Sequence, residues 1–186
     1  MKIVTKFILI TLFFFVFVGG AFAKTNFTSA PSPTPVAKPI EVNSFELFWP
    51  IAPGKTEGDF LYSLKLLKEK VREMFIFSGP KKAEYNALLS EKRVLEYEKL
   101  LITNKDYKNA SKTLNRLKAN QDKAASYLSK AKEAGQDISV SSSKVSEAFD
   151  KELLLLNSIF SRVDSSQKQT VTDAISHLTE VSSKIK

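Results

Sequence analysis

Residues 59–77 read DFLYSLKLLKEKVREMFIF, and the periodicity of this stretch decides the fold class. Its apolar residues recur every three or four positions: Phe60, Leu64, Leu67, Val71 and Phe75, widened by Leu61 and Met74. This spacing is typical of a helix with one buried face. The charged residues between them should face water: Lys65, Lys68, Glu69, Lys70, Arg72 and Glu73. Asp59 suits the N-cap, and Gly79-Pro80 should stop the helix.

Four later stretches show the same helical period: residues 81–103, 107–134, 144–163 and 167–185. In 107–134, Leu114, Gln121 and Leu128 fall seven apart, so Gln121 interrupts an otherwise apolar seam. The run LLLL at 153–156 is apolar on several sides, which predicts that 144–163 is the central, most buried helix.

The connections between these helices are short, and their ends carry typical helix-capping residues. Asp106 is placed to cap 107–134, and Gly135 is placed to end it. Short connections force neighbouring helices to run antiparallel. The sequence therefore predicts an all-α fold, an elongated antiparallel bundle of about five helices.

The N-terminal residues predict that the rest of the chain is located outside the cytoplasm. Lys2 and Lys6 precede an apolar run over 7–18 and a small-residue exit ending at Ala23, which is typical of a secretory signal peptide. Residues 1–23 are the predicted signal, with an uncleaved membrane anchor as the alternative. Residues 24–44 are rich in Pro, Ser and Thr and read as a linker, so the helical domain is assigned to 45–186.

An aromatic segment joins the linker to the first helix. Phe45, Leu47, Phe48 and Trp49 precede Pro50 and the Pro53-Gly54 turn. We expect a lid that packs on the 59–77 helix and closes one end of the bundle; a ligand platform is the alternative.

The composition favours no catalytic chemistry. The 186 residues include no cysteine, which excludes disulfides, thiol catalysis and cysteine-bound metal. His177 is the only histidine, and with Glu180 it lacks the further ligands of a closed metal site. The six glycines form no phosphate-binding loop. No nucleophile–base pair is available, so we expect no enzyme, no catalytic or metal residue, no cofactor and no small-molecule substrate.

Two motifs stand out in the first half of the helical region: a proline-led LY-x-LK helix, here Leu61-Tyr62 and Leu64-Lys65, and an E-x-R-x-x-E helix, here Glu91, Arg93 and Glu96. With these motifs, residues 51–102 resemble an uncharacterised bacterial domain of exported and membrane-tethered proteins. That domain has no assigned activity, so the resemblance implies a helical fold and an exported location only. We expect Tyr62, Leu64, Lys65, Glu91 and Arg93 to be structural, with Tyr62 and Arg93 joined by an interhelical hydrogen bond.

Two functions fit these observations. The first is a non-catalytic exported helical module that mediates protein contacts at the cell envelope, through an envelope partner or by self-association. The second is binding of anionic lipid or envelope polymer through the basic first hairpin, with contacts from Lys65, Lys68, Arg72, Lys81 and Lys82. The net charge of +8 is moderate, and acids alternate with bases, which together with export argues against nucleic acid.

Overall fold

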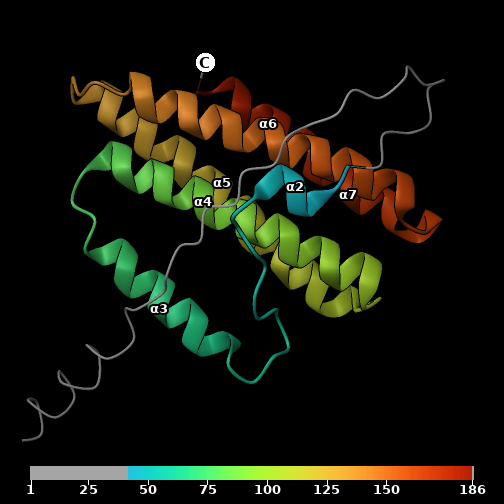
Figure 1. Cartoon of the computed structure of the whole chain (residues 1–186). Coiled ribbons are helices and arrows are strands. Elements are labelled where there is room, and N and C mark those ends of the chain that lie inside the picture. The colour runs from blue at the N-terminus through green and yellow to red at the C-terminus, as the bar shows by residue number, and fades with distance from the viewer. Residues whose placement is uncertain (1–41, 186) are drawn as a thin grey trace, which may run out of the picture. The chain divides into compact units, whose positions relative to one another are not determined.

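A computed structural model describes residues 42–185. The predicted signal segment and nearly all of the predicted linker lie outside these residues, and the predicted domain boundary stays a prediction. Within 42–185 the chain is helical and contains no strand, which confirms the predicted all-α class (Figure 1). The helices are α2 (Ser44–Phe48), α3 (Tyr62–Met74), α4 (Gly79–Glu98), the π-helical turn η1 (Lys99–Thr103), α5 (Tyr107–Glu133), α6 (Ser139–Arg162) and α7 (Ser165–Ser183).

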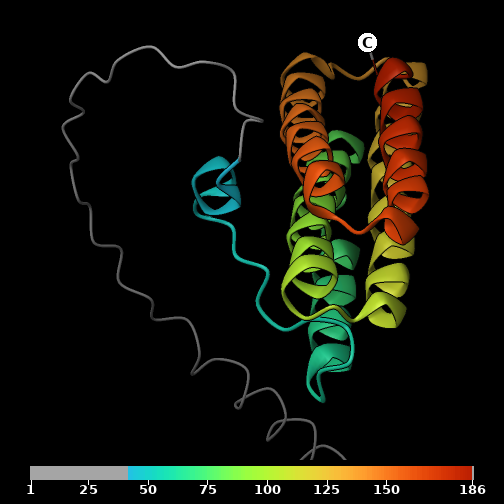
Figure 2. The same ribbon diagram turned by 90° about the vertical axis from the view of Figure 1, so that its right-hand side faces the viewer.

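Helices α4 to α7 form the predicted bundle around one apolar core (Figure 2). Helix α4 packs against α5 and α6, and α7 packs against α6 and α5. The short connections reverse the chain at each step, so neighbours in sequence are antiparallel. The seams meet at fully buried side chains such as Val94, Leu117, Leu156 and Val171.

Helix α4 has the most extensive contacts with the other helices, which corrects the prediction that the 144–163 helix is central. Leu154 in that helix is 54% exposed, whereas Leu155 and Leu156 are fully buried. An unbroken leucine run carries no periodicity, so it cannot indicate which side of the helix meets the core.

Among the described residues, no helix is long and apolar enough to cross a membrane.

The ends of α5 lie where the sequence predicts them, whereas the ends of α3 do not. The Asp106 carboxylate accepts from the Asn109 amide at 3.1 Å, and Gly135 has a φ of +70° just past the helix, both as predicted. Asp59 does not cap α3 with its side chain; its carboxylate pairs with Lys55 at 3.3 Å. Helix α3 ends at Met74, before Gly79-Pro80, and those two residues open α4 instead.

The predicted orientation of the first helix is wrong. Leu64, Leu67 and Val71 on α3 are 62%, 57% and 41% exposed, although the pattern predicted them to be buried. The side chains that turn toward the bundle come from the opposite face, beginning with Tyr62, which is 4% exposed. The backbone of α3 accordingly lies further from α4 than the backbones of packed helices within the bundle lie from one another (Figure 1).

The aromatic segment is only partly a lid, and it covers a different helix from the one predicted. Phe48 on α2 is buried in the main core, and α2 contacts α6 rather than α3. Phe45 and Trp49 are 61% and 68% exposed, and their rings meet edge to face at 5.0 Å.

Candidate functional site

The largest unexplained feature of the described chain is an exposed apolar surface on and around α3. We call it the α3 apolar face, and its members are Phe60, Leu61, Leu64, Leu67, Val71, Met74, Phe75 and Phe77. Their exposed fractions run from 41% for Val71 to 95% for Phe60. On protein surfaces in general, a large exposed apolar patch marks an interaction surface or an aggregation hazard.

The α3 apolar face points outward because the opposite face of α3 is bound to α4 by charged groups. The centre is Glu96, whose side chain is fully buried. It accepts hydrogen bonds from the Tyr62 hydroxyl at 2.9 Å and from Lys65 Nζ at 2.5 Å, and it also pairs with Arg93. Burial, reinforced by Glu96, raises the pKa of Tyr62 well above its usual range, so the phenol stays a donor.

The second half of this contact lies one to three turns further along α3. Arg93 also pairs with Glu69, so its buried guanidinium bridges two carboxylates. Asn86 Nδ2 donates to Glu73 Oε1 at 2.9 Å, and Lys123 of α5 lies 3.6 Å from the other Glu73 oxygen. Buried charges of this kind are tolerated only when paired, which fixes the polar face of α3 against the bundle.

Among the residues of α3, this arrangement leaves only basic charges exposed beside the α3 apolar face. Both acids of α3, Glu69 and Glu73, are turned inward and paired. Lys68, Lys70 and Arg72 remain exposed, and we call them the basic rim. At 3.6 residues per turn, Lys68 and Arg72 flank the apolar face on one side and Lys70 flanks it on the other.

The structure does not bring together the five basic residues that the sequence proposed for anionic contacts. Lys65 is held by Glu96 and by the carbonyl groups of Pro53 and Lys55. Lys81 pairs with Glu84 at 2.8 Å, and Lys82 lies over the Tyr127 ring at 5.6 Å. Of the five, only Lys68 and Arg72 belong to the basic rim.

Three of the five motif residues meet in the contact between α3 and α4. The predicted hydrogen bond between Tyr62 and Arg93 is not formed. Both side chains bind Glu96 instead, and the guanidinium lies 5.7 Å from the Tyr62 ring centre. Lys65 joins them on Glu96, whereas Leu64 points outward.

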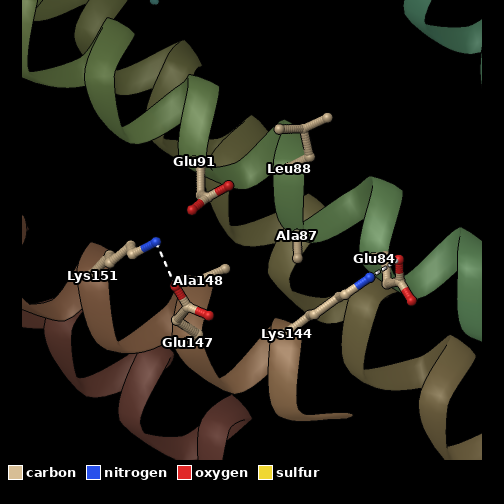
Figure 3. Close-up of a pocket in the computed structure, with 8 residues that line it drawn as sticks. All are labelled: Glu84, Ala87, Leu88, Glu91, Lys144, Glu147, Ala148 and Lys151. Atoms are coloured by element: carbon tan, nitrogen blue, oxygen red, sulfur yellow. Dashed lines mark hydrogen bonds and ion pairs between the residues drawn. The ribbon is translucent and has the colours of Figure 1, made fainter. Parts of the chain in front are cut away.

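Glu91 lies apart from that contact, in an open groove of about 250 Å³ between α4 and α6 (Figure 3). Two ion pairs border the groove: Lys144 with Glu84 at 3.3 Å and Lys151 with Glu147 at 2.7 Å. Glu91 is 8% exposed, and burial raises its pKa to about 7. Both lysines of the groove are thus held in ion pairs with carboxylates.

A buried carboxyl group at the core of the bundle was not predicted. Glu152 of α6 is fully buried, receives a hydrogen bond from Gln121 Nε2 at 2.6 Å and contacts Ser90 Oγ. Burial raises the pKa of Glu152 to about 8. The Ser90 hydroxyl also donates to the Ala87 carbonyl at 2.8 Å, and its single hydrogen cannot serve both acceptors. A protonated Glu152 that donates to Ser90 satisfies all of these contacts.

A signal for Glu152 was present in the sequence. Position 152 continues the stripe of Val145, Phe149, Leu156 and Ile159 at spacings of three and four. A polar residue on that stripe, opposite the Gln121 that interrupts the α5 seam, predicts a polar pair in the core.

His177 is placed near a single acid. Its Nε2 atom lies 3.2 Å from Asp122 Oδ1, while Glu180 pairs with Lys184. Within residues 42–185, no group of three or more His, Cys, Asp or Glu side chains is placed to hold a metal ion.

Comparison with known proteins gives one match. A family model described as "Domain of unknown function (DUF5667)" matches residues 54–185, which include α3 to α7. No curated protein and no solved structure matches the chain.

Proposed function

The chain belongs to the family of the domain of unknown function DUF5667, and we propose that it is a non-catalytic, exported helical module that makes contacts at the cell envelope through the α3 apolar face. Export is inferred from residues 1–23, whose charge, apolar run and small-residue exit are typical of a secretory signal. The Pro-rich linker would then set the reach of the module from its point of attachment.

The observation that carries this proposal is the exposure of Leu64, Leu67 and Val71 on a helix whose other face is fixed to α4 by buried ion pairs. Turning the apolar residues inward would require Glu69 and Glu73 to leave Arg93 and Asn86. Breaking a buried ion pair costs about 3–5 kcal/mol. The apolar face is therefore available to another molecule rather than to the bundle.

The absence of catalysis is supported by the chemistry of the charged groups. Both lysines of the groove in Figure 3 are paired with acids, and the core carboxyl group of Glu152 has only Ser90 and Gln121 as hydrogen-bond partners. A hydrolytic or transfer reaction would need a nucleophile and an adjacent base that a substrate can reach. Ser90 and Glu152 are fully buried, and the lysines of the groove are bound in ion pairs.

Site-specific cross-linking in the native envelope tests the proposal. Because the chain has no cysteine, Leu67→Cys places one photo-activated reagent on the α3 apolar face. The matched control is Leu154→Cys, a similarly exposed leucine on α6. We expect adducts to an envelope component, or to a second copy of the chain, from position 67 and few from position 154. Equal labelling from both positions, or none from position 67, would rule out α3 as the contact surface.

A further inference from the structure

We infer that the molecule received by the α3 apolar face is the surface of an anionic lipid bilayer, in which α3 lies parallel to the membrane plane. This inference rests on the proposed function, because it identifies what the same surface contacts. It differs from a general basic-hairpin contact, since the apolar side chains enter the lipid and the bases only flank them.

The first argument is the sorting of charge on α3. Of its six charged residues, Lys65, Glu69 and Glu73 are turned inward and bound to the bundle. The remaining three form the basic rim, so every charge that α3 itself places beside the apolar face is positive. Asp59, which precedes Phe60, is paired with Lys55 at 3.3 Å. Anionic headgroups complement such a rim, and each base near a charged leaflet strengthens binding about fivefold.

The second argument is the size and composition of the surface. The 13 residues of α3 extend about 20 Å, too short for a hydrocarbon core of about 30 Å. Amphipathic helices of this kind bury their apolar face about 5–10 Å into the boundary between headgroups and acyl chains. Phe60 and Phe77, 95% and 89% exposed, lie at the two ends of the face, where aromatic rings favour the interface. Lys68 and Lys70 can extend past the apolar side chains to the phosphates.

The third argument concerns a second copy of the chain, the main competing occupant. A two-fold pairing of α3 with itself would place the same surface on both sides, so the basic rims would face each other. No exposed acid of α3 could neutralise the two basic rims, because Glu69 and Glu73 are turned inward and paired. Like charges brought together at an interface cost binding energy, which favours lipid over self-association.

An environment-sensitive fluorophore on the full-length chain tests the inference. It is attached at Leu67→Cys on α3, and in a second protein at Ser176→Cys, an exposed position on α7. Both proteins carry the same N-terminal segment, so membrane attachment through that segment cannot explain a difference between them. Vesicles of phosphatidylcholine with and without phosphatidylglycerol are then added.

We expect a blue-shifted, stronger emission at position 67 with phosphatidylglycerol vesicles and no change at position 176. Lys68→Glu with Lys70→Glu should raise the lipid concentration for half-maximal change at least about twentyfold. Lys108→Glu with Lys112→Glu, the same charge change on α5, should leave it within about twofold. The effect at position 67 should weaken as salt is raised.

Three results would overturn the inference: no change at position 67, equal changes with neutral vesicles, or equal effects of the two charge reversals. If one of these three results is obtained and position 67 cross-links to a protein in the native envelope, the lipid inference fails and the proposed function stands. If neither vesicles nor envelope components respond, both fail.

Discussion

Glu152→Gln should remove most of the pH dependence of folding stability above neutral pH. The carboxyl group of Glu152 lies fully buried between α4, α5 and α6, and its contacts with Ser90 and Gln121 suit the protonated form. A glutamine there can donate to Ser90 and accept from Gln121, so it keeps the same contacts without the ability to ionise.

The sign and size follow from the raised pKa. Burial holds the pKa of Glu152 at about 8 in the fold, against 4.5 as its ordinary value, so the folded state binds the proton more tightly. Stability from this group is complete below 4.5, falls as pH rises and is lost above about 8. The whole difference corresponds to about 5 kcal/mol, of which about 3 kcal/mol falls between pH 6 and pH 9. Glu91, with a pKa raised by burial to about 7, adds a slope of the same sign at lower pH.

Urea unfolding followed by circular dichroism across this pH range measures the effect. The wild type should lose stability from pH 6 to pH 9, and Glu152→Gln should lose much less. The control is Glu147→Gln on the exposed side of the same helix, where pairing with Lys151 lowers the pKa; it should leave the alkaline loss unchanged. A wild type equally stable at both pH values would refute the reasoning, as would a glutamine variant with the full loss.

Three further changes test the fold. Glu96→Gln should lower the free energy of unfolding by about 3 kcal/mol, because Arg93 and Lys65 lose a buried partner, and hydrogen exchange should become faster in α3; unchanged exchange there would contradict the role of Glu96. Leu67→Ser should change stability by no more than about 0.5 kcal/mol, since the side chain is 57% exposed, whereas Leu117→Ala in the core should cost about 2–5 kcal/mol, both by urea unfolding; similar costs would show that α3 is packed the other way. Gly135→Ala should cost about 1 kcal/mol in thermal unfolding purely from the φ of +70°, as no atom lies within 4 Å of the added methyl group; a neutral result would argue against that backbone geometry.

The bundle helices could be predicted from sequence because their apolar residues recur at helical spacing and meet one another. Leu117 and Val171 lie on regular stripes, and both are buried in the core. The ends of α5 carry local signals in Asp106 and Gly135 that act within one turn.

The orientation of α3 could not be predicted in the same way. Periodicity identifies an apolar face on a helix but does not show what covers it. The outcome was decided by contacts between residues far apart in sequence, such as Glu69 with Arg93 and Tyr62 with Glu96. The family resemblance identified Tyr62, Lys65 and Arg93 as structural residues, but the common partner Glu96 became apparent only from the geometry.

Helix α3 contributes one buried residue, Tyr62, and no member of the main core cluster. Most of the apolar core thus comes from α4 to α7, and α3 is held against α4 mainly by polar and charged contacts. Substitutions at the outward positions of α3 should therefore change the proposed contact with little effect on the core. Selection on that contact and selection on folding would then act on different residues of the chain.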